Sequence, residues 1–224
     1  MTVEQLLIEC DVFRASEKKL SQCKPFSCDD DDIDVFFSKD FIANQHKLLG
    51  KTYFFCLKNQ PDTIVTAFSL SNDSIRLNNR ITDEYKEQFL EDTDLRDKNL
   101  KRFPAALIGR LGTNKDYCGR GYGSAIIDFI KILFRTNNRT GCRFLIVDAK
   151  NRPETLKFYE KNEFKYLIGD ERLEAKYMGI GMGHLPLNTR LMYFDLLKLA
   201  VHEKKLTSEI PNQPPTSNRQ LLTS

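Results

Sequence analysis

The sequence predicts an α+β fold in which helices pack on a mixed β-sheet. One observation is the stretch from Ala105 to Phe134, which passes from an apolar strand through a glycine-rich turn into an amphipathic helix. The other is the order of patterns along the chain: helix, hairpin, polar insert, strand–turn–helix, strand–helix and strand. Because no internal repeat or second domain is recognisable, we expect one domain over residues 1–202.

The middle of the central stretch contains glycines at three alternate positions, Gly119, Gly121 and Gly123. A helix start leaves backbone N–H groups without partners and carries the positive end of the helix dipole. Glycines let an anion approach those groups and tolerate the dihedral angles that aim several of them at one point. The turn therefore predicts a phosphate-binding loop, with a tight strand-to-helix connection that binds nothing as the alternative.

The N-terminal third predicts a helix followed by a hairpin. Residues 2–21 fit a first strand or a short helix. The segment Asp29–Asp34 is acidic except for one isoleucine, but the glycine and distal glutamate of a calcium loop are missing. The acids therefore indicate a helix start, capped by Ser27 or an early aspartate. Residues 51–58 and 63–70 are rich in aromatic and β-favouring side chains and predict the hairpin.

The segments on either side of the central stretch are less regular. The insert of about residues 73–103 is polar and charged and suggests one exposed helix. Residues 166–168 and 189–196 predict strands. The glycine-containing segment 169–187 predicts a flexible loop, and the polar, proline-containing segment 203–224 predicts a disordered tail.

The composition is that of an ordinary globular protein. Of the 224 residues, 41% are hydrophobic and 29% charged, and the net charge of +3 is too small to argue for nucleic-acid binding by itself. No apolar run approaches a membrane span and the first residues lack a signal-peptide pattern, which favours a cytoplasmic protein. The six cysteines form no C-x-x-C pair, so they predict free thiols and no metal site.

Two blocks of the sequence resemble the GNAT superfamily of N-acetyltransferases. The first, Arg110–Ser124, is similar to the family's acyl-CoA loop, Gln/Arg-x-x-Gly-x-Gly/Ala. Its glycines match at Gly121 and Gly123, whereas Cys118 stands at the Gln/Arg position. The second block, residues 142–164, looks like the family's next strand and helix and ends like its "FYxxxGF" signature, with a glutamate in place of the glycine.

The resemblance implies a three-layer α/β/α arrangement, with a mainly antiparallel mixed sheet whose two central strands splay apart to admit acetyl-CoA. It places the pyrophosphate on the N–H groups of residues 118–124 and pairs the pantetheine arm with the backbone of Leu111 and Thr113. It also has Asn151 hydrogen-bond the pantetheine amides, with capping of the following helix as the alternative for this side chain. The implied cofactor-binding residues are Leu111, Gly112, Thr113, Cys118, Gly119, Arg120, Gly121, Tyr122, Gly123, Ser124, Asn151 and Phe158.

The implied reaction is direct attack of a primary amine on acetyl-CoA in a ternary complex. Tyr159 matches the family's tyrosine near the sulfur, and a phenol of pKa about 10 suits proton donation to the departing thiolate. The alternative for Tyr159 is a half-buried packing residue. No general base is recognisable, because the three histidines are isolated in the sequence.

One subgroup of the family suggests an alternative acceptor. The runs Phe26–Cys28, Leu49–Tyr53 and Arg102–Pro104 look like GNAT toxins of toxin–antitoxin pairs, which acetylate the α-amine of aminoacyl-tRNA. That likeness implies aminoacyl-tRNA and an antitoxin as partners, and a homodimer is compatible with it. A basic helical row of Lys157, Lys161 and Lys165 suits RNA, or is a solvated face. A general primary-amine acetyltransferase is the main expectation, and aminoacyl-tRNA acetylation and a CoA-binding regulatory module without catalysis are the alternatives.

Overall fold

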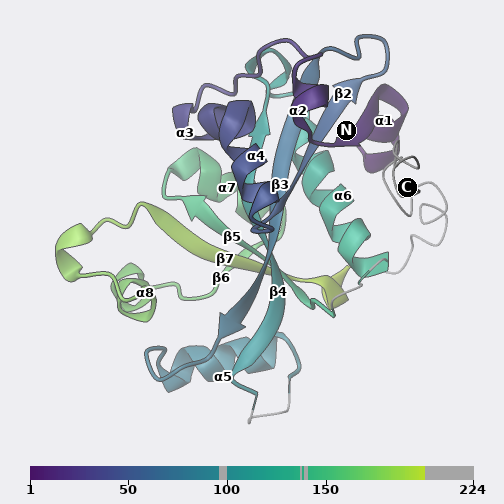
Figure 1. Cartoon of the computed structure of the whole chain (residues 1–224). Helices are drawn as coiled ribbons and strands as arrows, with labels where there is room; N and C mark the ends of the chain where they lie inside the picture. The colour runs from purple at the N-terminus through teal and green to yellow at the C-terminus, as the bar shows by residue number, and fades with distance from the viewer. Residues whose placement is uncertain (96–99, 137, 139–140, 200–224) are drawn as a thin grey trace, which may run out of the picture. The chain divides into compact units, whose positions relative to one another are not determined.

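The computed structural model describes residues 1–95, 100–136, 138 and 141–199 (Figure 1). Seven strands form one sheet in the order β1-β2-β3-β4-β5-β7-β6. The β1–β2, β5–β7 and β6–β7 pairs are antiparallel, and the β4–β5 pair is parallel. The predicted α+β fold with a mixed, mainly antiparallel sheet is therefore confirmed. No helix in the described ranges combines the length and apolarity needed to cross a lipid bilayer.

The chain packs into two compact units. The first comprises residues 1–67 and 112–126, and the second comprises residues 68–111 and the described part of 127–199. The prediction of one domain over residues 1–202 stays a prediction. Three elements contribute residues to both units: β3 (Ile64–Arg76), β4 (Arg102–Thr113) and α6 (Tyr122–Thr136).

The first unit contains α1 (Val3–Glu9), β1 (Cys10–Arg14), α2 (Glu17–Leu20), α3 (Asp31–Val35), a π-helical turn (Phe36–Asp40), α4 (Phe41–His46) and β2 (Lys51–Leu57). Residues 2–21 thus form helices and a strand. The predicted acidic helix start is confirmed, because the Asp30 carboxylate accepts the Ile33 N–H as the N-cap of α3. Ser27 instead donates its hydroxyl to Asp34.

The core of the first unit is aromatic. Phe37, Phe41 and Phe54 are almost completely buried, and their rings meet edge to face, the Phe41 and Phe54 centroids being 5.5 Å apart. Such pairs contribute about 0.5–1.5 kcal/mol beyond burial of their apolar area. This packing attaches the α3–α4 segment to the β2–β3 hairpin.

The second unit contains α5 (Asp83–Asp92), β5 (Phe144–Lys150), α7 (Pro153–Lys161), β6 (Lys165–Tyr166), α8 (Glu171–Met178) and β7 (Thr189–Asp195). The helix expected in the insert is α5, but it is not merely an exposed addition. Phe89 is 2% exposed and its ring packs against Phe103, Phe144 and Tyr193. The polar composition of the insert concealed its core residues, which also include Ile75, Leu77 and Ile81.

The prediction of a flexible loop over residues 169–187 is wrong for its first half. The segment contains α8, because Asp170 accepts the N–H groups of Arg172 and Leu173 as an N-cap. Gly179 ends the helix in a left-handed conformation with φ of 75°. The tail predicted over residues 203–224 lies outside the described residues.

Candidate functional site

The glycine loop lies in the first unit, between β4 and α6. A short 3-10 turn at Lys115–Tyr117 leads into it, and the Asn114 side chain accepts the Asp116 N–H at the start of that turn. Gly119 and Gly121 have φ angles of 76° and 88°, a left-handed region that a side chain strongly disfavours. The helix begins at Tyr122, so the N–H groups of its first turn have no intrahelical partner and point toward the loop.

Two glycines of the predicted site are also required by close packing. A Cβ on Gly121 would lie 3.0 Å from the Met1 backbone nitrogen, and a Cβ on Gly112 would lie 2.9 Å from Ile33 and 3.2 Å from the Cys28 sulfur. Gly119 is different, because nothing lies within 4 Å of a Cβ built there. The open space beside Gly119 suits the approach of an anion to the loop.

Side chains around the loop hold it in place. The Tyr122 hydroxyl donates to the Glu9 carboxylate at 2.6 Å, and burial together with that carboxylate raises the pKa of Tyr122. The Arg120 guanidinium donates to the Asp116 carbonyl oxygen and lies over the Tyr117 ring. Cys118 is exposed, but desolvation and then the charge of Asp29 raise the pKa of its thiol, which disfavours the reactive thiolate.

One edge of β4 is already used in the first unit. The Thr66 hydroxyl donates to the Gly112 carbonyl oxygen at 2.9 Å, and the Asn114 N–H donates to the Val65 carbonyl oxygen at 2.8 Å. Backbone polar groups alternate between the two edges of a strand. The backbone groups of Leu111 and Thr113 therefore face away from β3.

In the second unit, β4 and β5 stop pairing part of the way along. Their parallel register runs from Ala105 opposite Phe144 to Leu107 opposite Ile146, although β4 continues to Thr113 and β5 to Lys150. β5 remains paired with β7 as far as Lys150. This is the strand divergence that the resemblance implies.

Tyr159 lies in the second unit on α7 and is 8% exposed. Its ring packs at 5.1 Å from Phe158 and 5.4 Å from Phe164, centroid to centroid. Burial raises the pKa of Tyr159, so its hydroxyl stays protonated at any physiological pH. It is therefore available as a proton donor, and it is more deeply buried than the sequence suggested.

Asn151 follows β5, but it does not cap the next helix. The N-cap of α7 is Arg152, and Pro153 occupies the first helical turn. The Asn151 side chain instead donates from Nδ2 to the Glu171 carboxylate at 2.9 Å and to the Leu187 carbonyl oxygen at 2.8 Å.

Asp148 is a candidate that the sequence reading missed. It is the exposed position in β5, and strand alternation puts it on the face that carries Phe144 and Ile146. Although solvent reaches it, desolvation by its surroundings raises its pKa, the charge of Asp73 raises it further, and Arg110 opposes both. An acid at the end of the apolar run 144–147 was the available sequence signal.

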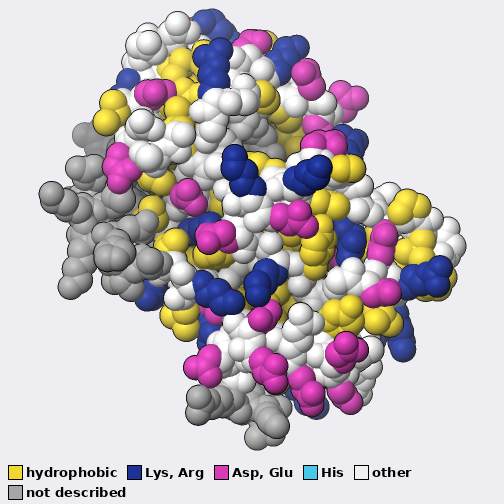
Figure 2. Space-filling model, turned by 180° about the vertical axis from the view of Figure 1, so that it is seen from behind, with side chains coloured by type: hydrophobic (Ala, Val, Ile, Leu, Met, Phe, Trp, Pro, Cys, Tyr) yellow, Lys and Arg dark blue, Asp and Glu magenta, His cyan; other side chains and the backbone are white. Residues whose placement is uncertain are grey.

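The predicted basic row is interrupted. α7 ends at Lys161, so Lys165 lies in β6, where it pairs with Asp92 at 3.0 Å. Lys157 and Lys161 are exposed on α7. Figure 2 shows Lys and Arg side chains mixed with Asp and Glu on the face in view, not a continuous basic surface.

The structure brings together the loop residues 112–124 in the first unit, whereas Leu111, Asn151, Phe158 and Tyr159 belong to the second. Sequence comparison adds nothing to these positions, since no protein-family model and no curated protein matches the chain.

Solved structures do match the fold. AtaT in complex with acetyl-methionyl-tRNAfMet is 13% identical with a TM-score of 0.60, over 84% of this chain and 95% of that one. AtaTR bound with AcCoA is 13% identical with a TM-score of 0.61, and the match covers 85% of this chain and 95% of that one. A KacT variant is 14% identical with a TM-score of 0.62, and the match covers 84% of this chain and 96% of that one. The chain therefore has the GNAT-like fold of these proteins.

Proposed function

We propose that this protein is an N-acetyltransferase that transfers an acetyl group from acetyl-CoA to a primary amine. The observation that carries the proposal is the glycine loop, where two left-handed glycines lead directly into the first turn of α6. The GNAT-like fold supports the same assignment, because the AtaTR structure is described as bound with AcCoA.

In this proposal the cofactor pyrophosphate binds the N–H groups of Gly119–Ser124, with open space at Gly119 to admit it. The pantetheine arm pairs with the edge of β4 that β3 leaves free, at Leu111 and Thr113. The Cys118 N–H already donates to the Lys115 carbonyl oxygen at 3.3 Å, so the proposal relies on the later N–H groups of the loop and requires no contact from Cys118.

The chemistry uses two side chains of the second unit. The amine nitrogen attacks the thioester carbonyl carbon, the C–S bond breaks, and Tyr159 gives its proton to the departing thiolate. Asp148 accepts the proton that the attacking amine loses, a role for which its raised pKa suits it. A donor to the oxyanion would come from the backbone near Leu111 or Thr113.

The second candidate function is acetylation of the α-amine of aminoacyl-tRNA, with an antitoxin as partner. The fold neighbours favour it, since AtaT was solved with acetyl-methionyl-tRNAfMet, and a mutant of AtaT was solved with the C-terminus of the antitoxin AtaR. The engagement of Lys165 by Asp92 weighs against a broad RNA-binding surface on this chain. The general amine acetyltransferase is therefore the primary proposal.

Calorimetric titration with acetyl-CoA tests the cofactor site. The variant Gly119→Glu puts a negative charge in the loop without a steric clash, because nothing lies within 4 Å of the new Cβ. Gly141→Glu is the matched control, since Gly141 also has a left-handed φ of 70° and open space but lies outside the loop.

We expect the wild type and Gly141→Glu to bind equally, and Gly119→Glu to bind at least about tenfold more weakly. Equal binding by all three proteins would contradict the loop assignment. No binding by the wild type would overturn the proposed function.

A further inference from the structure

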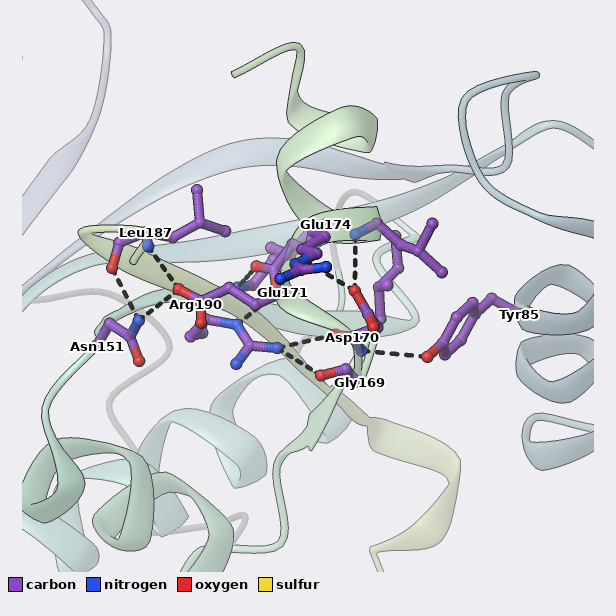
Figure 3. Close-up of polar contacts among 12 residues, drawn as sticks. Tyr85, Asn151, Gly169, Asp170, Glu171, Glu174, Leu187 and Arg190 are labelled. Carbon is purple, nitrogen blue, oxygen red and sulfur yellow. Dashed lines mark hydrogen bonds and ion pairs between the residues drawn. The ribbon is translucent and has the colours of Figure 1, made fainter. Parts of the chain in front are cut away.

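One carboxylate fastens the segment before β7 to the end of β5. An oxygen of Glu171 accepts a hydrogen bond from Asn151 Nδ2 at 2.9 Å and another from the Leu187 N–H at 2.5 Å. Asn151 Nδ2 also donates to the Leu187 carbonyl oxygen (Figure 3). We call these three residues the Asn151 clasp.

The backbone extends the clasp. The Asn151 N–H donates to the Asn188 carbonyl oxygen at 2.9 Å, next to the last β5–β7 pair, Lys150 opposite Thr189. Two donors of one residue therefore hold the turn at residues 187–188 against the carboxyl end of β5.

Hydrogen bonds also hold the start of α8, which lies at the other end of the segment before β7. Arg190 donates to the Glu174 carboxylate at 2.6 Å and to the Gly169 carbonyl oxygen at 2.9 Å, both within the same network. The Tyr85 hydroxyl accepts the Asp170 N–H at 3.1 Å (Figure 3). α8 is thus anchored through its first turns, and the chain from Gly179 to Pro186 bridges the two anchors, with Met182 54% exposed.

The clasp uses the whole donor capacity of one side chain. A side-chain amide has two N–H hydrogens, and Asn151 directs them to Glu171 and Leu187. Asn151 therefore cannot donate to a ligand without releasing the segment. Its structural bonds account for an asparagine at this position independently of any cofactor.

The position of the clasp suggests its purpose. Where neighbouring parallel strands of a sheet diverge, ligands bind outside their carboxyl ends. β4 and β5 are parallel and stop pairing after Leu107 and Ile146, and the clasp sits at the carboxyl end of β5. We propose that Asn151 and Glu171 are positioning residues that hold residues 179–187 in place as the wall that selects the acceptor amine.

This inference rests on the proposed function for the identity of the substrate, but the fastening itself is independent of it. Asn151→Asp keeps an acceptor oxygen, loses both donors and sets a second carboxylate against Glu171. Glu171→Gln removes the charge. The double variant exchanges donor and acceptor across the pair and restores one hydrogen bond between the two side chains.

Three measurements separate the roles. Hydrogen exchange of residues 180–187 reports fastening, calorimetry reports acetyl-CoA affinity, and initial rates with methionine amide and methionyl-tRNA report the acceptor KM. For Asn151→Asp we expect faster exchange, acetyl-CoA affinity within about twofold of wild type, and an acceptor KM raised about tenfold. The double variant should recover part of the lost protection.

Weaker acetyl-CoA binding by Asn151→Asp with unchanged exchange would overturn the proposal and make Asn151 a cofactor ligand. Faster exchange with an unchanged acceptor KM would also overturn it, because the segment would then not select the amine. Failure of the proposed function looks different: the wild type would neither bind acetyl-CoA nor acetylate either amine, and the acceptor role would fall with it.

Discussion

The two units of this protein build functional groups by different means. In the first unit the glycine loop is made from backbone, and its geometry depends on the left-handed angles of Gly119 and Gly121. In the second unit the candidate groups are side chains, placed by burial at Tyr159 and by hydrogen bonds at Asn151. A backbone site is disrupted by adding a side chain, whereas a side-chain site is disrupted by removing one polar atom.

The sharpest test of the second unit is Tyr159→Phe. The change removes one hydroxyl from a ring that stays packed between Phe158 and Phe164. If Tyr159 protonates the thiolate, kcat should fall by about 100-fold or more, since general acid catalysis contributes about 10²–10⁴-fold. Acetyl-CoA affinity, measured by calorimetry, should not change.

Tyr166→Phe is the control for that experiment, because Tyr166 is a partly exposed tyrosine of the same unit. Its turnover should stay within about twofold of wild type. Normal turnover by Tyr159→Phe would show that the phenol only packs. The second unit would then contribute no catalytic acid at this position.

A pH profile tests Asp148. A base works only when deprotonated, so kcat/KM should fall as the pH drops through the pKa of Asp148, which lies above its ordinary 3.8. Asp148→Asn should lower kcat/KM by about tenfold or more and abolish this acidic limb. Asp73→Asn removes a charge that raises that pKa, so it should move the limb to lower pH. An acidic limb unchanged in Asp148→Asn would assign it to another group.

The sequence predicted the backbone-built loop of the first unit better than the side-chain contacts of the second unit. The loop was predictable because glycines at alternate positions before an apolar helix report backbone geometry directly. The fold was predictable from strand and helix periodicity, together with the family resemblance. The Asn151 clasp was not, since it joins residues up to 36 positions apart. Neither was the burial of Phe89 within a polar insert, because composition does not show which face of a helix meets the core.

Glu163 allows the backbone and side-chain contributions to be compared at one position of the second unit. Here a residue with a side chain adopts a left-handed angle like those of the loop glycines. It holds φ of 65° where the family pattern has glycine, and its carboxylate lies 3.4 Å from the Lys131 ammonium, which is buried over the Phe194 ring. Glu163→Ala loses the ion pair and keeps the strain of about 1 kcal/mol, whereas Glu163→Gly relieves that strain. Urea unfolding should find the glycine variant about 1 kcal/mol more stable than the alanine variant. Equal stabilities would mean that the left-handed angle carries no strain.

The smallest expected effect concerns one of the side chains that support the backbone-built loop. Tyr122→Phe removes the hydrogen bond to Glu9 and should lower stability by about 1 kcal/mol, because a hydrogen bond to a charged group contributes roughly 1.5–3 kcal/mol and solvent takes over part of it. The N–H groups of the loop remain, so acetyl-CoA affinity should fall only about two- to fivefold. Tyr117→Phe keeps the neighbouring ring, 6.0 Å away, and should leave affinity unchanged. A loss of more than about 1,000-fold in Tyr122→Phe would mean that the loop, too, depends on side chains, since one hydrogen bond of at most about 3 kcal/mol cannot account for it.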